Sequence, residues 1–167
     1  LFSVVRFGNV IGTRGSVLPK FIEQFKKNKK ITLTDKVSTR FFVTVNDAVK
    51  SILQSVEIMK GGEIFIPKTL NAIKIYDLVT ALSKIFNKSK SKVILSGLRA
   101  GEKVHEGIIT DREYPLLKYH NNIFIVDQNN NHKFKNIKNR MSYFNSEKAK
   151  LLSVSKIKEY LLSNKLI

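Results

Sequence analysis

Residues 4–21 read VVRFGNVIGTRGSVLPKF, an apolar run followed by a loop with three glycines and then a second apolar pattern. Val4 to Phe7 favour a buried strand, because β-branched and aromatic side chains fit a pleated, buried surface. Residues 16–27 have the spacing of an amphipathic helix, with Ser16 as its N-cap. The apolar face of that helix consists of Leu18, Phe21, Ile22 and Phe25. A strand that passes through a loop into a helix is typical of an α/β layer.

The loop glycines raise the question of a dinucleotide phosphate site. A glycine-rich turn before a helix offers backbone N–H groups and a positive dipole end to an anion. The spacing here is Gly8-x-x-x-Gly12-x-x-Gly15, however, so the middle glycine of the Gly-x-Gly-x-x-Gly fingerprint is missing. Asp35 occupies the place of the acidic ribose ligand in such a motif. The spacing favours a plain strand-to-helix turn over a phosphate loop.

Along the rest of the chain, segments with the apolar pattern of strands alternate with segments that have the apolar spacing of helices. This alternation favours an α/β fold in one unit. Asn46 or Asp47 is the expected N-cap of the second helix, and Gly61-Gly62 is its expected stop. Residues 127–139 are polar and rich in Asn and Lys, so we expect a mobile loop there. Further strands are expected at 31–34, 40–45, 63–67, 92–97 and 121–126, and further helices at 46–59, 74–87, 102–109 and 153–164.

Composition narrows the function classes. The 167 residues are 43% hydrophobic, with no apolar run of membrane-spanning length and no secretory leader, so we expect a soluble, cytoplasmic protein. The absence of cysteine excludes disulfides, a thiolate nucleophile and cysteine metal sites. The three histidines have no metal-binding spacing, and no metal site is predicted. The chain begins at Leu1 inside an expected strand, which indicates a fragment.

The net charge of +17 is compatible with a basic nucleic-acid-binding module. Residues 128–167 carry nine basic and two acidic side chains, and they are the best candidate for such a module. Aromatic residues such as Phe134 and Tyr143 are too few there to form a base-stacking platform. The 24 lysines against six arginines fit an A/T-rich coding bias, so we do not expect a nucleic-acid partner.

Four segments resemble, in order and spacing, the C-terminal half of the extended short-chain dehydrogenase/reductases that act on nucleotide sugars. The similarity is closest to the inverting UDP-N-acetylglucosamine 4,6-dehydratases and their polysaccharide-biosynthesis relatives, and the tail from Arg140 resembles the end of that family. The segments are VVRFGNVIGTRGSVLPKF (4–21), ITLTDKVSTRFFVTVNDAV (31–49), GGEIFIPK (61–68) and GLRAGEKVHEGII (97–109).

The resemblance implies the C-terminal part of an NAD(P)-binding Rossmann-like fold, mainly its mixed α/β substrate-binding lobe. Residues 1–15 would be the last part of the Rossmann sheet and the crossing loop. Residues 16–126 would be the substrate-binding lobe. Residues 127–167 would be a polar loop and a C-terminal helix.

The resemblance assigns four polar substrate contacts. Asn9 would bind near the sugar and diphosphate, since an amide both donates and accepts hydrogen bonds. Arg40 would bind the diphosphate, Arg99 the diphosphate or nucleobase side, and Glu102 the ribose hydroxyls. Ala100 replaces the proline that the family usually has in this turn. Other roles stay open: Asn9 as a residue that shapes a turn, Arg40 as a strand-edge arginine that faces water, and Glu102 as a favourable charge at a helix N-terminus.

Two apolar residues complete the implied site. Val17 and Leu33 match positions that touch the uracil ring, although both are equally suited to a core. His105 and Glu106 lack the second histidine of a zinc motif, so we expect them to face solvent or a neighbouring helix.

The resemblance also implies NAD or NADP as cofactor, bound mainly by a preceding half. Arg6, Phe7 and Gly8 would line its nicotinamide side through their backbone. The catalytic Tyr-x-x-x-Lys pair is expected upstream of Leu1, so no catalytic residue is assigned here. Tyr114 and Lys118 have the spacing, but Pro115 interrupts them and we interpret the pair as a coincidence.

The implied function is C5-inverting dehydration of UDP-N-acetylglucosamine, for surface polysaccharide or flagellin glycan (pseudaminic acid) biosynthesis. In that reaction a hydride leaves C4 of the sugar, water leaves C6, and the hydride returns at C6. A UDP-sugar 4-epimerase shares the C4 step and stays open as an alternative. We expect the chain alone to be inactive, the full-length enzyme to be a homo-oligomer, and no membrane partner.

Overall fold

The computed structural model of the chain describes residues 1–88, 93–137 and 144–167. The strands are β1 (Val4–Val5), β2 (Asn9–Val10), β3 (Ile31–Leu33), β4 (Thr39–Val43), β5 (Glu63–Pro67), β6 (Asn71–Lys74), β7 (Val93–Leu95), β8 (Leu117–His120), β9 (Ile123–Asp127) and β10 (Lys135–Asn136). The helices are α1 (Val17–Lys26), α2 (Val45–Ile58), α3 (Ile75–Ile85) and α4 (Val154–Ser163), with a 3₁₀ turn η1 (Tyr114–Leu116).

The described strands form three sheets that mix parallel and antiparallel pairs. The largest has the order β1-β5-β9-β8-β10, and the smaller ones are β2-β4-β6 and β3-β7. The pairs β1–β5, β2–β4 and β3–β7 are parallel, whereas all other pairs are antiparallel. The prediction of a mixed α/β fold is therefore confirmed.

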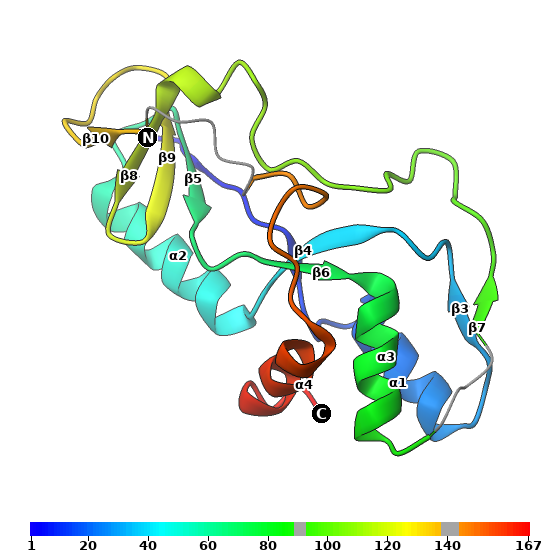
Figure 1. The fold of residues 1–167 in the computed structure, drawn as a ribbon. Helices are drawn as coiled ribbons and strands as arrows, with labels where there is room; N and C mark the ends of the chain where they lie inside the picture. Colours follow the sequence, from blue (N-terminus) through cyan, green and yellow to red (C-terminus); the bar gives the residue numbers. More distant parts are fainter. Residues whose placement is uncertain (89–92, 138–143) are drawn as a thin grey trace.

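Figure 1 shows that α2 lies along the five-stranded sheet, whereas α1, α3 and α4 gather at the other end of the molecule. The three gathered helices share one core, in which Phe21, Phe25, Leu78, Leu82 and Ile157 are fully buried. None of the helices in the described part of the chain is long and apolar enough to span a membrane.

The apolar face predicted for α1 is the face that the structure buries, and the predicted helices α3 and α4 likewise bury one apolar side. The N-cap of α2 was predicted wrongly. The cap is Thr44, whose Oγ1 accepts from the Asp47 N–H at 3.0 Å and donates to the Asp47 carboxylate at 2.7 Å. The Thr44 hydroxyl thereby satisfies one of the free N–H groups in the first turn of the helix. With Thr44 as the cap, Asn46 and Asp47 lie inside that first turn.

The helix predicted at 102–109 is also wrong, because this segment is hydrogen-bonded to other parts of the chain. Its Val104 carbonyl accepts from the Thr39 N–H, its Ile108 N–H donates to the Phe144 carbonyl, and its Glu106 carbonyl accepts from the Ser146 N–H. These distant partners take the backbone groups that a helix would pair internally.

The strands β8 and β9 form a hairpin, of which the sequence predicted only the second strand, β9. Asn121 and Asn122 form its two-residue turn, both with positive φ (39° and 66°), the conformation that a type I′ turn requires. The strand predicted over 121–126 includes both asparagines. The Asn-Asn pair between two apolar runs was the signal for the hairpin.

Residues 128–134 form a loop, as predicted, but part of it is held by hydrogen bonds to a buried lysine, and its mobility stays a prediction. Lys118 Nζ is buried and donates to Asp127 at 2.8 Å, to Asn130 at 2.6 Å and to the His132 carbonyl. These contacts fold the segment back so that β10 pairs with β8. The remainder of the predicted loop, 138–139, and Lys92 of a predicted strand lie outside the described residues.

Candidate functional site

A cavity of about 330 Å³ lies where several elements converge: β2, the N-terminus of α1, β3, β4, the start of α3 and the turn at residues 97–102. The lining combines apolar side chains with charged, amide and hydroxyl groups. The apolar lining consists of Val17, Phe21, Leu33, Phe42 and Ile75, and the polar lining includes Asn9, Ser16, Lys20, Thr34, Arg40, Arg99 and Glu102. Apolar side chains together with convergent polar groups are the usual features of a small-molecule site.

All six residues that the sequence predicts as substrate contacts line this one cavity: Asn9, Val17, Leu33, Arg40, Arg99 and Glu102. They come from segments far apart in the chain. Gly101 has φ of 78°, a conformation suited to glycine, in the turn that brings Arg99 and Glu102 to the same wall. The ligand-binding roles of the six residues stay a prediction.

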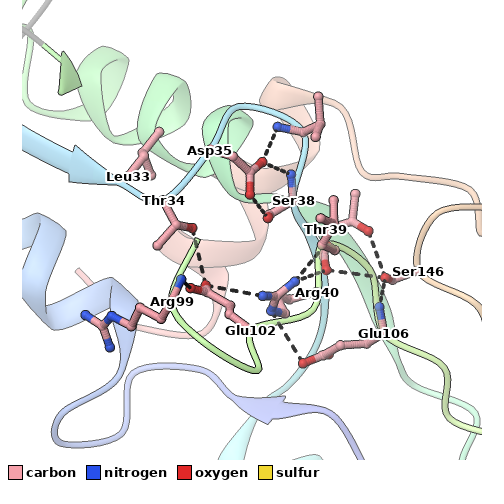
Figure 2. Close-up of polar contacts among 12 residues, drawn as sticks. Leu33, Thr34, Asp35, Ser38, Thr39, Arg40, Arg99, Glu102, Glu106 and Ser146 are labelled. Carbon is pink, nitrogen blue, oxygen red and sulfur yellow. Dashed lines mark hydrogen bonds and ion pairs between the residues drawn. The ribbon is translucent and has the colours of Figure 1, made fainter. Parts of the chain in front are cut away.

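Arg40 is held by the protein on several sides (Figure 2). Its Nη1 donates to the Thr39 carbonyl at 2.8 Å and to the Val104 carbonyl at 2.9 Å. Its guanidinium also lies 3.5 Å from Glu102 and 3.4 Å from Glu106. The side chain is 13% exposed, so it is neither a strand-edge arginine in water nor an unpaired cation.

His105 and Glu106 contact β4 rather than a neighbouring helix, and both side chains also remain partly exposed to solvent. His105 Nδ1 lies 2.7 Å from Thr39 Oγ1, which also lies 2.7 Å from the buried Ser146 Oγ. Ser146 Oγ accepts from the Glu106 N–H at 2.8 Å. Burial raises the pKa of Glu106, although Arg40 acts in the opposite direction. This network fixes the backbone around Arg40.

The N-terminus of α1 gives the cavity a positive end. No acidic residue lies in its first turn, and the side chain of its N-cap, Ser16, makes no capping hydrogen bond. Ser16 Oγ is buried without a hydrogen-bond partner among the described residues. The side chains of Lys20 and Arg99 also make no polar contact within the described part of the chain, and Figure 2 shows the Arg99 guanidinium extending away from Glu102. This positive end of the cavity favours a bound anion such as a phosphate group.

Asp35 does not line the cavity. Its carboxylate accepts from the Val37 N–H at 2.6 Å, from the Ser38 N–H at 2.6 Å and from the Ser38 hydroxyl. Burial opposes ionisation, but these hydrogen bonds outweigh it and lower the pKa of Asp35. Asp35 therefore builds the turn between β3 and β4, in agreement with the rejection of a phosphate-loop motif.

The predicted cofactor residues Arg6, Phe7 and Gly8 lie outside this lining. Arg6 donates to both carboxylate oxygens of Glu113, at 2.8 and 2.9 Å, and to the Ile108 carbonyl. Phe7 packs on the core beneath β4. A Cβ at Gly8 would lie 2.3 Å from the Phe41 carbonyl oxygen, so glycine is required here by close packing against β4.

The sequence prediction missed Ser16, Lys20 and Thr34 as cavity residues. Lys20 lies three residues after the predicted Val17 position, on the same side of α1, and Ser16 directly precedes Val17 as the N-cap; these positions could have identified both. Thr34 Oγ1 lies 3.3 Å from Glu102. Among the described residues no group of His, Cys, Asp and Glu could hold a metal ion.

Comparison with known proteins identifies the family. Residues 1–128 match the family of polysaccharide biosynthesis proteins. An uncharacterized membrane protein of Methanocaldococcus jannaschii is 37% identical over 96% of this chain and 49% of its own length. An inverting UDP-N-acetylglucosamine 4,6-dehydratase of Campylobacter jejuni is 41% identical over 75% of this chain and 36% of its own length.

A UDP-glucose 4-epimerase of Rickettsia bellii is 42% identical over 68% of this chain and 33% of its own length. The X-ray structure of Pen from Bacillus thuringiensis matches 99% of this chain and 50% of that chain, with a TM-score of 0.88 and 33% identity. The chain thus spans at most about half the length of these relatives. The chain belongs to the polysaccharide biosynthesis protein family and has the fold of the C-terminal part of an extended short-chain dehydrogenase/reductase.

Proposed function

We propose that the chain binds a UDP-sugar in the cavity between α1, β4 and the 97–102 turn, as part of a nucleotide-sugar-modifying enzyme. The observation that carries the proposal is the convergence of Asn9, Val17, Leu33, Arg40, Arg99 and Glu102 on one lining. Relatives named as a UDP-N-acetylglucosamine 4,6-dehydratase and as a UDP-glucose 4-epimerase support it.

In this proposal the diphosphate lies near the N-terminus of α1, between Lys20 and Arg99. Both side chains lack a polar contact within the described residues, so a diphosphate need not compete with a protein carboxylate for them. Arg40 is already shared by Glu102 and Glu106, so its main role is to position the Glu102 carboxylate. Glu102 accepts from the ribose hydroxyls, and the uracil packs on Val17 and Leu33.

The reaction that we propose for the complete enzyme is C5-inverting 4,6-dehydration, with 4-epimerisation as the alternative. A bound NAD or NADP would supply the hydride acceptor for either reaction. The predicted backbone contacts of Arg6, Phe7 and Gly8 with the nicotinamide remain part of this proposal; in this chain Arg6 is paired with Glu113 and the other two pack against β4 and its core. We therefore assign binding and orientation of the UDP-sugar to this chain and expect no turnover from it alone.

Thermal unfolding with UDP or UDP-N-acetylglucosamine tests the binding proposal. Ligand at ten times its Kd stabilises a protein by about 1.4 kcal/mol, which raises the Tm of a chain of this size by about 3–5 °C. Arg99→Ala removes the rise, whereas Arg112→Ala, a charge-matched change at an exposed position outside the lining, preserves it.

Absence of any Tm change at millimolar UDP in the folded chain contradicts the proposal. The nucleic-acid alternative makes a different prediction, since a basic module would bind random DNA with a steep dependence on salt concentration.

A further inference from the structure

Three polar side chains form a hydrogen-bonded network behind the cavity, which we call the Thr39 network. Thr39 Oγ1 lies 2.7 Å from His105 Nδ1 on one side and 2.7 Å from Ser146 Oγ on the other. Thr39 is 3% exposed and Ser146 is fully buried. All three residues lie outside the cavity lining. Any effect of the network on a ligand must therefore pass through the groups that the network holds.

The contacts of Ser146 fix the direction of this network. Ser146 Oγ accepts from the Glu106 N–H at 2.8 Å and donates its one hydrogen to the Thr39 carbonyl at 3.3 Å. It therefore accepts from the Thr39 hydroxyl, which in turn accepts from His105 Nδ1–H, since a hydroxyl has one hydrogen and two lone pairs. In the opposite direction, no hydrogen would remain for the Thr39 carbonyl. The network thus requires a hydrogen-bond donor at the position of His105 Nδ1.

The Thr39 network ends on the groups that hold Arg40. The Thr39 carbonyl accepts from Arg40 Nη1 at 2.8 Å as well as from Ser146 Oγ. The Glu106 carboxylate lies 3.4 Å from Arg40 Nε, and the Glu106 carbonyl accepts from the Ser146 N–H at 2.8 Å. Figure 2 shows Ser146 linked to both Thr39 and Glu106. Removal of the Ser146 hydroxyl therefore loosens two supports of one guanidinium.

Arg40 in turn holds the carboxylate of Glu102, which lines the cavity. Arg40 Nη2 lies 3.5 Å from Glu102 Oε1, which also accepts from Thr34 Oγ1 at 3.3 Å. The other oxygen, Oε2, accepts from the Arg99 N–H at 3.2 Å. These contacts are longer than the usual charged hydrogen bond of about 2.7–2.9 Å, so none of them alone fixes the carboxylate. A shift of Arg40 therefore changes the orientation of Glu102.

We propose that Thr39, His105 and Ser146 are positioning residues that make the cavity selective for a nucleotide with free ribose hydroxyls. The inference rests on the proposed function, in which Glu102 accepts from those hydroxyls. A site that hydrogen-bonds a ligand hydroxyl rejects an analogue without it, because the acceptor is left unpaired. This rejection requires the acceptor to be held at the hydroxyl position by its supporting contacts. The Thr39 network supplies that support through Arg40.

Titration calorimetry with UDP and with 2′,3′-dideoxy-UDP tests the inference. The parent chain binds UDP at least about ten-fold more tightly than the dideoxy analogue. Ser146→Ala weakens UDP binding about ten-fold and leaves binding of the analogue within about two-fold, so the ratio of the two affinities falls toward one. A general loss of structure would weaken both ligands by the same factor.

The matched control is Ser55→Ala, which removes a buried serine hydroxyl in α2, outside the cavity lining, and leaves the affinity ratio unchanged. Glu102→Ala abolishes the preference for UDP. Addition of Ser146→Ala to Glu102→Ala changes the ratio no further, because both substitutions act through the same carboxylate.

Conservative substitutions separate positioning from packing. Thr39→Val removes the hydroxyl at nearly constant volume and lowers the ratio, whereas Thr39→Ser keeps the hydroxyl and the ratio. His105→Asn places an amide N–H near the position of Nδ1 and preserves the ratio. His105→Gln places its amide near the position of Nε2 and lowers the ratio. These variants decide the question if Ser146→Ala does not fold.

An unchanged ratio in folded Ser146→Ala and Thr39→Val overturns the inference and leaves UDP binding intact. Equal losses of affinity for both nucleotides also overturn it, since the network would then be purely structural. A parent chain that binds the two nucleotides equally well contradicts the inference at Glu102. A parent chain that binds neither contradicts the proposed function itself, and the inference with it.

Discussion

Arg40 and Glu102 form an ion pair of 3.5 Å at the wall of the cavity, and the same guanidinium reaches Glu106 at 3.4 Å. Arg99 lies three residues before Glu102 in the same turn, and its side chain makes no such contact among the described residues. The two cavity arginines therefore have different roles. Arg40 stabilises the fold of the site, whereas Arg99 is available to a ligand.

The first prediction compares lysine substitutions at these two arginines. Arg40→Lys lowers the free energy of unfolding by about 1–3 kcal/mol, because one ammonium cannot replace contacts to two carbonyls and two carboxylates. Arg99→Lys leaves stability unchanged and weakens UDP binding about ten-fold, because an ammonium cannot form the bidentate contact that a guanidinium forms with a phosphate. Denaturant unfolding and titration calorimetry measure the two effects. Equal loss of stability in both variants would contradict the division of roles.

The second prediction concerns the caps of α1 and α2. Thr44→Ala lowers the free energy of unfolding by about 0.5–2 kcal/mol, because the reciprocal bond with Asp47 is lost. Ser16→Ala leaves stability unchanged or raises it, since Ser16 Oγ is buried without a partner among the described residues. Urea unfolding of the two variants under the same conditions checks the contrast. A larger loss in Ser16→Ala than in Thr44→Ala would refute it.

The third prediction separates two reasons for glycine on either side of β2, at Gly8 and at Gly15. Gly8→Ala forces apart the backbones of Gly8 and Phe41, so we expect a loss above about 3 kcal/mol or failure to fold. Gly15→Ala meets nothing within 4 Å, and only its φ of 80° opposes the change. We expect it to cost about 1–2 kcal/mol. Soluble yield and Tm distinguish the two variants, and similar values would contradict the packing argument.

The fourth prediction is a pH dependence carried by Glu113. Hydrogen bonds from Arg6 lower the pKa of Glu113 to about 2, from an ordinary value of 4.5. Since the folded pKa is the lower one, this stabilisation is complete above about pH 4.5 and is lost as the pH falls toward 2. Glu113→Gln should be less stable than the parent at pH 7, and the difference should shrink as the pH falls from 4.5 toward 2.

The matched control is Glu23→Gln, which removes a solvent-exposed pair with Lys27 and should have little effect at any pH. Thermal unfolding between pH 7 and pH 2.5 measures both differences. A stability difference for Glu113→Gln that does not change over this range would rule out the linkage.

The sequence predicted those elements whose folding is decided locally. The apolar faces of α1, α3 and α4 recur at helical spacing, and the structure buries them. The segment 102–109 has a helix-like composition, yet Thr39, Phe144 and Ser146 take its backbone hydrogen bonds. No local pattern reveals partners at such distances in the chain.

The sequence predicted which residues line the site, but not which of them contact one another. The family resemblance selected Asn9, Arg40, Arg99 and Glu102, which share one lining. It did not indicate that Arg40 is occupied by Glu102 and Glu106, because ion pairs between distant segments leave no mark in spacing. The buried pair of Lys118 and Asp127 was missed for a different reason, because the sequence analysis did not predict β8, the strand of the hairpin that carries Lys118.

The most direct test of UDP-sugar binding is a residue-resolved titration of the isotope-labelled chain with UDP, followed by backbone amide NMR shifts. We expect the largest shifts at Gly15, Val17, Thr34 and Arg99, which surround the cavity. The amides of Lys27 and Leu166, which line a separate cavity on the outer side of α1, should not move. Shifts confined to that second cavity or to residues 128–137, or none at millimolar UDP, would contradict the account.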